Sequence, residues 1–196
     1  MALFLNWNVN GLRSRLPELK LLISTLNPIC CTFQETNLTP IDDPQIRNHI
    51  LYRRDRTATQ HASGGVCVCV RRTVFSEVVP LVTPLEAVAV SVRFPDRITV
   101  CSLYLPPGLH VDRREIDTLL RQLPAPYIVC GDFNAYNPLW GSPRFDTRGR
   151  LLEQIFSEAN LIILNNDHPT HFNAVNGTFS HLDLSVCTST ISHALN

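Results

Sequence analysis

The chain lacks any hydrophobic run long enough to cross a membrane. None of its uninterrupted apolar stretches approaches the roughly 20 residues that a membrane-spanning helix needs. The start, Met1 to Asn8, also lacks the basic region and long apolar stretch of a secretory signal peptide. We therefore expect no membrane association and a nuclear or cytoplasmic location.

Lysine and net charge are scarce too. Lys20 is the only lysine among 17 Lys and Arg residues, and 17 Asp and Glu residues bring the formal net charge to zero. The arginines gather in clusters at residues 13–15, 53–56, 71–72, 113–114 and 144–150. Because guanidinium forks bind phosphate oxygens in pairs, some clusters suit a phosphodiester substrate; the alternative is that they are solvated surface charges.

No Cys-x-x-Cys pair occurs among the seven cysteines, which argues against a zinc site. Four of them lie in apolar runs, and Cys67 and Cys69 alternate with valines. The odd number and the lack of an export signal favour buried, reduced thiols over disulfides.

Repeats and low-complexity segments are absent as well. With 44% apolar and 17% charged residues, the chain of 196 residues is typical of a globular protein with a substantial core. Nothing in the sequence resembles a linker, so we expect a single domain over residues 1–196.

The pattern predicts mainly strands, with three helices among them. Apolar, often valine-rich runs bounded by turn residues predict strands at 3–9, 29–35, 50–53, 65–71, 74–79, 87–94, 98–105, 127–131, 161–165, 178–180 and 182–188. Helical spacing predicts helices from a cap at Ser14 to Leu26, over 112–123 and over 149–159. The four strands from 65 to 105 are expected to be antiparallel neighbours. These elements favour an α/β (α+β) fold in which helices cover two packed sheets.

Polar side chains recur where the predicted strands end. The positions are Asn8, Asn10, Gln34, Glu35, Tyr104, Asp132, Asn134 and Asp183. Each one alone suits a turn, a solvated strand end or a buried hydroxyl. Because strand ends gather at one rim of a sheet, together they are expected to line a cleft.

Five motifs in this order resemble the endonuclease/exonuclease/phosphatase superfamily, which includes abasic-site endonucleases and DNase I-like enzymes. They are Trp7-Asn8-Val9-Asn10-Gly11-Leu12, Gln34-Glu35-Thr36, Ser102-Leu103-Tyr104, Gly131-Asp132-Phe133-Asn134-Ala135 and Ser180-His181-Leu182-Asp183. The resemblance implies a four-layer sandwich of two mixed β-sheets flanked by helices.

Further residues resemble the endonuclease domains of jockey-like non-LTR retrotransposons. They are GDFNAYNPLWGS at 131–142, Asp146-Thr147-Arg148-Gly149-Arg150-Leu151-Leu152, Asp167-His168-Pro169-Thr170-His171-Phe172 and Asn176-Gly177-Thr178. Such domains usually belong to a polyprotein that carries a reverse transcriptase. The resemblance therefore implies nicking of double-stranded DNA and a reverse transcriptase domain as partner, and we expect a monomer.

The resemblance also implies a single catalytic Mg²⁺ (or Mn²⁺). It assigns Glu35 as the principal ligand and places Asn8 near the metal or the scissile phosphate, and oxygen donors of this kind suit a hard cation. Asp132 would orient or deprotonate the attacking water, and Asn134 would position water and phosphate. Tyr104 would donate a hydrogen bond to the phosphate.

Asp183 is implied to orient a histidine that contacts the same phosphate. In the family this histidine comes from a downstream Ser-Asp-His element, whereas neither His181 nor His193 follows an aspartate. We therefore expect a domain that is incomplete at its C-terminal end, lacks its last strand or strands, and is weakly active or inactive.

Contacts with DNA are expected at the cleft and in a neighbouring loop. Asn10 ends the first strand, and Thr170 and Ser180 match family positions that bind the DNA backbone or support the site. In the loop at 136–144, Trp140 and Arg144 are expected to press on the DNA backbone or a groove.

Other interpretations stay open. The chain can be an abasic-site nuclease or a phosphatase of the same fold, although the inserted loops of abasic-site enzymes are not found. It can also be a non-catalytic remnant that binds nucleic acid, although the catalytic positions are intact. A phosphate loop at Gly64-Gly65 and a metal pair of His168 and His171 are weak alternatives, because no helix follows the glycines and no glutamate partners the histidines.

Overall fold

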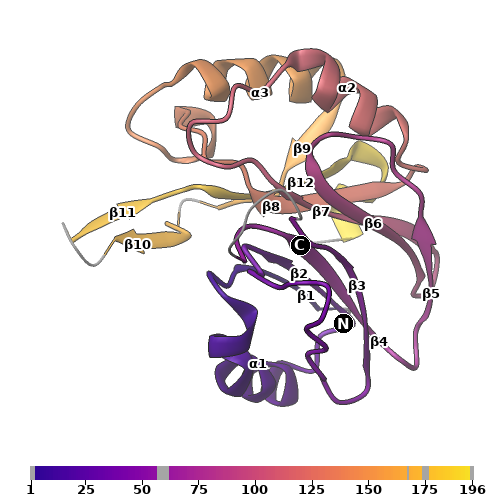
Figure 1. Ribbon diagram of the computed structural model, residues 1–196. Coiled ribbons are helices and arrows are strands. Elements are labelled where there is room, and N and C mark those ends of the chain that lie inside the picture. Colours follow the sequence, from indigo (N-terminus) through magenta and orange to yellow (C-terminus); the bar gives the residue numbers. More distant parts are fainter. Residues whose placement is uncertain (1–2, 57–61, 167, 174–176, 195–196) are drawn as a thin grey trace.

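Two β-sheets pack face to face and helices cover their outer sides in the computed structural model, which describes residues 3–56, 62–166, 168–173 and 177–194 (Figure 1). The helices are α1 (Leu12–Leu26), α2 (Arg113–Arg121) and α3 (Thr147–Glu158), with the short 3-10 helices η1 (Pro138–Trp140) and η2 (Ser189–Ala194). This is the four-layer α/β sandwich that the sequence resemblance implied.

The first sheet has the strand order β1-β2-β4-β3. Its strands are β1 (Phe4–Asn8), β2 (Cys30–Gln34), β3 (His49–Arg54) and β4 (Val66–Arg71). β1 and β2 are parallel, so both run toward the same rim and end there at Asn8 and Gln34. The other pairs are antiparallel. Helix α1 packs on the outer face of this sheet.

The second sheet has the strand order β5-β6-β7-β8-β12-β9. Its strands are β5 (Phe75–Val79), β6 (Glu86–Arg93), β7 (Arg97–Tyr104), β8 (Tyr127–Asp132), β9 (Leu161–Ile163) and β12 (Asp183–Thr188). β7 and β8 are parallel and end side by side, whereas β12 runs antiparallel to β8 and begins where β8 ends. Three neighbouring strands of this sheet, β7, β8 and β12, therefore place polar residues at one rim.

Three apolar layers hold the sandwich together. One lies between the sheets and contains Val68, Val100 and Ile128. Another lies between the second sheet and helices α2 and α3, and a third lies under α1. Side chains of alternate strand positions fill both sides of each sheet, which explains why these strands are apolar runs and do not alternate with polar residues.

Two local predictions need correction. Helix α1 begins at Leu12, and Ser14 is not its cap: the Ser14 hydroxyl donates to the carbonyl of Gly11, the residue at the cap position. The four strands from 65 to 105 do not form one antiparallel series. β4 belongs to the first sheet, and only β5, β6 and β7 are consecutive neighbours. A valine-rich composition indicates that a strand is buried in a sheet, but it does not indicate to which of the two sheets the strand belongs.

A separate hairpin projects from the rim between β9 and β12. It consists of β10 (His171–Asn173) and β11 (Thr178–Ser180) and extends away from both sheets in Figure 1. The sequence predicted β11 but not β10.

All seven cysteines are buried and free of disulfide bonds, as predicted. Burial raises the pKa of Cys101 and Cys130, so these two thiols remain neutral. In the described ranges no helix is long and apolar enough to cross a membrane.

Candidate active site

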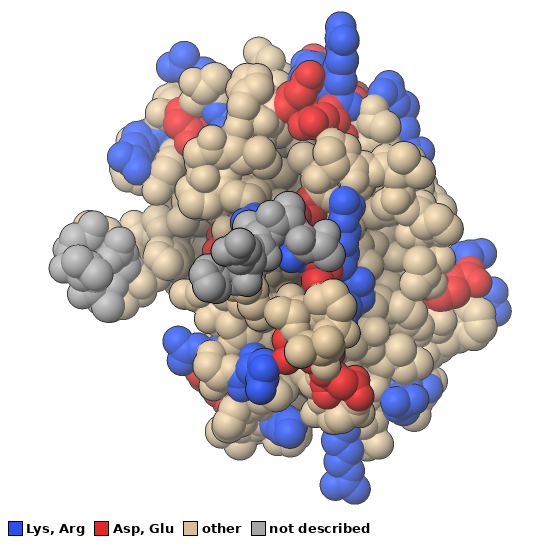
Figure 2. Space-filling view, in the orientation of Figure 1, with Lys and Arg blue, Asp and Glu red and all other residues tan. Residues whose placement is uncertain are grey.

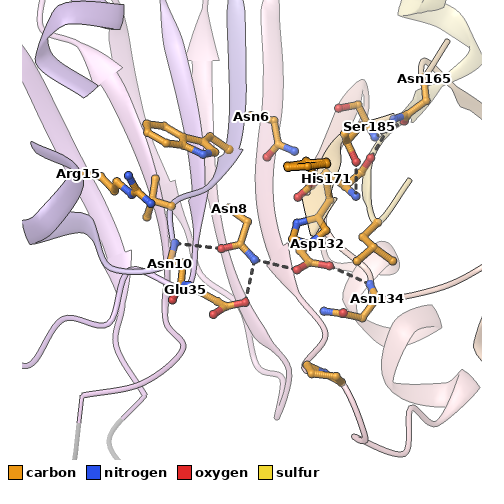
Figure 3. A pocket seen from close by; sticks show the side chains of 17 residues that line it. Asn6, Asn8, Asn10, Arg15, Glu35, Asp132, Asn134, Asn165, His171 and Ser185 are labelled. Carbon is orange, nitrogen blue, oxygen red and sulfur yellow. Dashed lines mark hydrogen bonds between the residues drawn. The ribbon is translucent and has the colours of Figure 1, made fainter. Parts of the chain in front are cut away.

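Most of the predicted polar strand ends meet in one cleft, whereas Gln34 and Tyr104 are buried and do not line it. Tyr104 pairs with Asp132 across β7 and β8, and Asp132 pairs with Asp183 across β8 and β12. Asn8 and Glu35 reach the same cleft from the first sheet. The cleft has a volume of about 780 Å³ and opens between the two sheets (Figure 3).

Asn8 joins the two sheets at the centre of this cleft. Its Nδ2 donates to Glu35 Oε1 and to Asp132 Oδ2, both at 2.8 Å. Its Oδ1 accepts the backbone N–H of Asn10 at 3.1 Å, which fixes the orientation of the amide (Figure 3). A single side chain therefore sets the spacing between the two carboxylates.

Glu35 has a left-handed backbone with a φ of 49°, which costs about 1 kcal/mol or more for a residue other than glycine. The surrounding backbone holds it there: the Glu35 carbonyl accepts the N–H of Gly11 at 2.7 Å, and Thr36 N–H donates to Gly65 at 3.2 Å. The turn directs the side chain out of the sheet and into the cleft. Strain held in this way at a cleft is a feature of functional positions.

Asp132 is held at both carboxylate oxygens. Asn8 donates to Oδ2, and the backbone N–H of Asn134 donates to Oδ1 at 2.9 Å. Asn134 reaches this position through a left-handed φ of 46°, and its Nδ2 donates to the Leu105 carbonyl at 3.2 Å. Burial raises the pKa of Asp132, and the negative Glu35 adds to the shift, against the two hydrogen bonds that lower it.

The phenol of Tyr104 is buried next to these carboxylates. Burial, together with the charge of Glu35 and a hydrogen bond to it, raises the pKa of Tyr104 far above its ordinary value. The Arg56 guanidinium lies 5.9 Å from the centre of the ring. Tyr104 is therefore a neutral hydrogen-bond donor at any ordinary pH.

Asp183 is the most strongly perturbed carboxyl of the cleft. Burial, together with the negative charge of Asp132, raises its pKa to about 7. Its Oδ1 is buried without a hydrogen-bond partner among the residues described. Thr170 Oγ1 accepts the backbone N–H of Asp183 at 3.1 Å and so joins the hairpin to β12.

The predicted DNA-binding positions separate into two groups. Asn10 and Thr170 are exposed and line the cleft. Ser180 lies at the end of the hairpin, where its carbonyl accepts the N–H of Thr170 at 3.0 Å, so it supports the cleft without lining it. Arg144 is exposed, and its guanidinium stacks 3.9 Å above the ring centre of Tyr136.

Trp140 does not fit its predicted role as a DNA contact. Its side chain is only 2% exposed, packs near Phe156, and donates from Nε1 to the Ala135 carbonyl at 3.2 Å. A tryptophan in a polar, glycine-rich loop resembles a surface aromatic in sequence, but here it anchors that loop to the core.

We expect Trp140→Phe to lower the free energy of unfolding by about 1–2 kcal/mol, because it removes the indole hydrogen bond and leaves a small cavity. Urea unfolding measures this loss. DNA affinity and the pattern of cleavage should stay as in the wild type, and a change in the pattern at unchanged stability would restore the contact role.

Most of the arginine clusters serve the fold. Their partners are carboxylates or backbone carbonyls: Asp42 for Arg13, Leu85 and Thr83 for Arg54, Glu86 for Arg56, Asn27 and Pro28 for Arg71, and Asp117 and Glu158 for Arg113. Figure 2 shows basic and acidic side chains interspersed on one face, without a single basic patch. Arg15 is exposed and lines the cleft, and Arg144 is exposed and stacks on Tyr136.

Several residues of the cleft were not assigned a role from the sequence. Asn6, Arg15, Asn165 and His171 line it (Figure 3), and the charge of His171 acts on Asp132. Arg15 belongs to the arginine cluster at 13–15 and His171 to the motif at 167–172, but neither pattern indicated that the side chain lines the cleft. A residue before a strand end can face the cleft or the core, and only the register decides which.

The motif residues Gln34 and Ser102 lie beneath the cleft. Gln34 Nε2 donates to Asn6 Oδ1 at 3.0 Å and to Ser102 Oγ at 2.9 Å, and Ser102 Oγ donates to the Phe33 carbonyl at 3.1 Å. The two bonds of Ser102 cross between the sheets through the core, whereas the bond between Gln34 and Asn6 joins neighbouring strands of the first sheet. The bonds of Ser102 fix the distance between the sheets on which the cleft depends.

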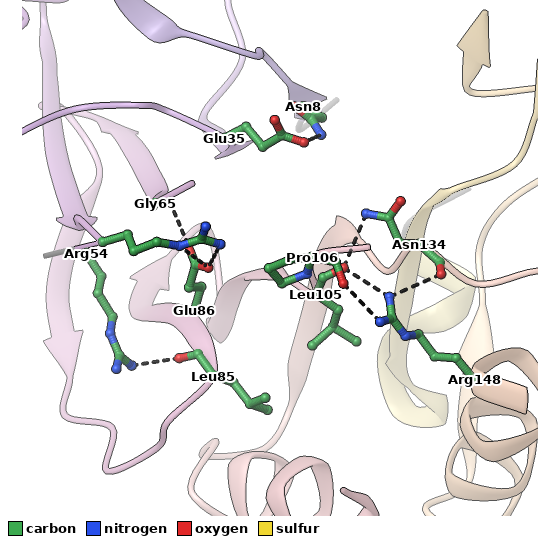
Figure 4. A network of polar contacts seen from close by, with 11 residues as sticks. Asn8, Glu35, Arg54, Gly65, Leu85, Glu86, Leu105, Pro106, Asn134 and Arg148 are labelled. Carbon is green, nitrogen blue, oxygen red and sulfur yellow. Dashed lines mark hydrogen bonds and ion pairs between the residues drawn. The ribbon is translucent and has the colours of Figure 1, made fainter. Parts of the chain in front are cut away.

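The weak phosphate-loop and metal-pair alternatives find no support. The Gly65 N–H donates to the Glu86 carboxylate, which would repel a phosphate there (Figure 4). Across the described parts of the chain, no group of three His, Cys, Asp or Glu side chains is arranged to hold a metal ion.

Comparison with known proteins places these features in a family. A family profile described as Endonuclease-reverse transcriptase matches residues 98–195, half of the chain. The RNA-directed DNA polymerase from mobile element jockey of Drosophila melanogaster is 23% identical over 171 residues, which are 85% of this chain and 18% of that protein. The probable RNA-directed DNA polymerase from transposon BS of the same species is 27% identical over 171 residues, again 85% of this chain and 19% of that protein. This chain spans about a fifth of the length of these relatives.

Solved structures match over nearly the whole chain. The endonuclease domain of TRAS1, a telomere-specific non-LTR retrotransposon, has a TM-score of 0.78 and 25% identity and covers 95% of this chain and 84% of that one. An AP endonuclease from Archaeoglobus fulgidus has a TM-score of 0.74 and 16% identity, with 98% and 89% covered, which is a likeness of fold. The chain therefore belongs to the endonuclease–reverse transcriptase family and has the DNase I-like fold of non-LTR retrotransposon endonuclease domains.

Proposed function

We propose that this chain is a divalent-metal-dependent endonuclease that nicks double-stranded DNA by hydrolysing a phosphodiester bond. The observation that carries the proposal is the Asn8 amide, which holds Glu35 and Asp132 at 2.8 Å each in an open cleft that Asp183 also lines. The buried Tyr104 lies next to Asp132 on the neighbouring strand. The family to which the chain belongs supports it.

The donor set of the cleft fits Mg²⁺ or Mn²⁺. Glu35 offers a carboxylate, and the Asn8 Oδ1 beside it offers an amide oxygen, whereas soft sulfur ligands are absent from the lining of the cleft. A hard cation that keeps most of its waters needs only one or two protein oxygens, which agrees with the lack of a cluster of three ligands among the described residues. When bound, the ion would neutralise charge on the phosphate and favour ionisation of water.

Asp132 is suited to act as the general base. Its pKa is raised toward neutral pH, which makes the carboxylate a stronger base than an ordinary aspartate. The hydrogen bonds from Asn8 and Asn134 hold both carboxylate oxygens in place, so the lone pairs that would accept a proton have fixed directions. The neutral Tyr104 hydroxyl can donate to a phosphate oxygen as negative charge builds on it. Asn134 presents its amide beside the same position.

Asp183 is suited to hold an imidazole. Its free, buried Oδ1 is an acceptor without a donor in the described part of the chain, and an N–H of a histidine would satisfy it. This role agrees with the family resemblance. We propose that a histidine at this position contacts the phosphate and that turnover without one is slow.

DNA fits the surfaces on either side of the cleft. On one side the hairpin carries Phe172 and Phe179, which are 53% and 65% exposed and stack with ring centres 4.8 Å apart. On the other side Pro107 and Asn134 line both the cleft and a second cavity of about 760 Å³, which Tyr136 also lines. A duplex can follow this track, and exposed aromatic side chains at its end can press on bases or sugars.

We expect alanine at both Phe172 and Phe179 to weaken duplex binding by about tenfold, because the pair loses its contact with the minor groove or a base step. Fluorescence anisotropy with a labelled duplex measures the affinity. Phe75→Ala is the matched control, since Phe75 is 62% exposed on β5, at the far end of the second sheet. Equal affinities for the double variant and the wild type would remove the hairpin from the DNA-binding surface.

Supercoiled plasmid is the direct test of the proposed function. We expect conversion to the nicked form with Mg²⁺ or Mn²⁺ and none with EDTA. Plain duplex, abasic duplex and a small phosphate monoester, compared at equal concentration, distinguish a DNA endonuclease from an abasic-site enzyme and a phosphatase. Turnover of the monoester alone would move the function to a phosphatase, and no turnover of any substrate would favour a non-catalytic protein.

We further propose that residues 1–196 act as one monomeric domain beside a reverse transcriptase, because the curated relatives are RNA-directed DNA polymerases. A nuclear or cytoplasmic location stays a prediction.

A further inference from the structure

The first turn of helix α3 is joined to the loop that follows Asp132. The Asp146 carboxylate accepts the N–H of Gly149 at 2.6 Å and that of Tyr136 at 3.2 Å, and the Asp146 N–H donates to the Tyr136 carbonyl at 3.0 Å. A Cβ on Gly149 would lie 2.1 Å from the Tyr136 carbonyl oxygen, so only glycine permits this approach. The Asp146–Gly149 turn is thus fixed against the loop.

Arg148, in the middle of this turn, reaches five backbone carbonyls with one guanidinium. Nη1 donates to Leu105, Phe133 and Asn134 at 3.0–3.1 Å, and Nη2 donates to Pro106 and Leu109 at 2.9 and 2.7 Å. Figure 4 shows the contacts with Leu105, Pro106 and Asn134. These carbonyls belong to two segments. One begins directly after Tyr104 and the other directly after Asp132.

The contact with the second segment bears on Asp132. The Asn134 carbonyl that Arg148 binds belongs to the residue with the left-handed φ of 46°, whose N–H donates to Asp132 Oδ1. Without the guanidinium, the carbonyls that converge on it would repel one another and the strained turn would lose a restraint. The direction of the Asp132 carboxylate depends on that turn.

The position of Arg148 also argues against a phosphate contact. Its Nη atoms are engaged with carbonyls, whereas Arg144, four residues earlier, is exposed. The two Nη groups of a guanidinium spread four N–H donors over a planar fork, so that five carbonyls can be bound when one hydrogen is shared. An ammonium group has three donors at one point and cannot reach all five.

We propose that Arg148 is a positioning residue: its guanidinium fastens the segment after Tyr104 to the segment after Asp132 and so holds both groups in their reactive directions. The consequence for catalysis rests on the proposed nuclease function, whereas the consequence for the two segments does not. The Asp146-Thr147-Arg148-Gly149 motif then acts by fixing the two segments in place and not by binding DNA.

Hydrogen–deuterium exchange tests the structural part without any activity. In Arg148→Met, amides in residues 105–109 and 133–136 should exchange roughly tenfold faster than in the wild type. Arg150→Met is the matched control on the same helix, because Arg150 is exposed and stacks over Phe145 at 5.5 Å. Unchanged exchange in Arg148→Met would overturn the proposal, whether or not the wild type nicks DNA.

Kinetics test the catalytic part if the wild type nicks plasmid. In Arg148→Met, kcat should fall on the order of 100-fold, with KM and duplex affinity within about threefold of the wild type. Arg148→Lys keeps the charge and should be nearly as slow. Recovery of protection and turnover in Arg148→Ala on adding methylguanidinium would support positioning even if Arg148→Met is unstable.

A loss confined to affinity, restored by lysine, would identify a phosphate contact and overturn the proposal. A wild type without activity would defeat the nuclease function and leave the exchange result to decide on Arg148.

Discussion

Glu35→Gln is expected to reduce metal-dependent nicking by about three orders of magnitude or more, which corresponds to about 4 kcal/mol of transition-state stabilisation. The carboxylate is the cleft's charged oxygen donor from the first sheet, and its replacement by a neutral amide removes the charge that would retain a divalent cation. Glutamine preserves the shape of the side chain and an oxygen that can accept from Asn8. The loss should therefore appear in activity and not in folding.

Plasmid nicking across a Mg²⁺ titration measures this effect, with thermal unfolding in EDTA as the check on folding. Glu77→Gln is the control, since Glu77 is exposed on β5, at the far end of the second sheet from the cleft, and pairs with Arg97. A Glu35→Gln protein that nicks at the wild-type rate would show that the cation, if any, is held elsewhere. Activity that returns at high Mn²⁺ would instead indicate weakened metal binding at the proposed place.

The strand ends of the site could be predicted because two independent patterns agreed on them. Short apolar runs ended at Asn8, Glu35, Tyr104 and Asp132, and parallel or antiparallel pairing brings such ends to one rim. The motif resemblance then fixed their order. Local sequence was sufficient here because the strands are buried and their limits are marked by turn residues.

Other features depended on contacts that local sequence does not contain. The prediction for Trp140 was wrong because its loop lacks regular structure, so no period distinguishes an inward from an outward side chain. β4 was placed beside β5 in error because both are valine-rich. The partners of Arg148 come from segments 14 to 43 residues away in sequence, and only the fold brings them together.

Asp183 should make the protein less stable as the pH rises, which is the opposite of the usual effect of an aspartate. Its pKa is raised to about 7 in the folded state from an ordinary value of 3.8, because burial and the nearby Asp132 disfavour its charge. At any pH between 3.8 and about 7, the carboxyl of Asp183 therefore keeps its proton in the folded protein and has lost it in the unfolded chain. The free energy of unfolding falls across that range, by about 4 kcal/mol in total, and the loss is complete above the folded pKa.

Asp183→Asn removes this dependence and should stabilise the protein at high pH. We expect the variant to exceed the wild type by about 4 kcal/mol at pH 8, and the two to converge below about pH 3, where Asp183 is protonated in both states. Urea unfolding in EDTA at a series of pH values measures the difference. Asp43→Asn is the control, since Asp43 is an exposed aspartate outside the cleft.

The raised pKa of Asp183 also bears on the proposed chemistry. A carboxyl whose pKa is about 7 is only partly ionised at neutral pH, and a cationic imidazole bonded to its free Oδ1 would lower that pKa and make the carboxylate permanent. Wild type and Asp183→Asn with parallel pH profiles would mean that Asp183 is ionised in the folded chain and already has a positive partner. Profiles that diverge above pH 5 would mean that Asp183 has no positive partner in the folded chain. The buried carboxyl would then lower the free energy of unfolding at neutral pH, and its place in the cleft would serve a partner that binds its free Oδ1.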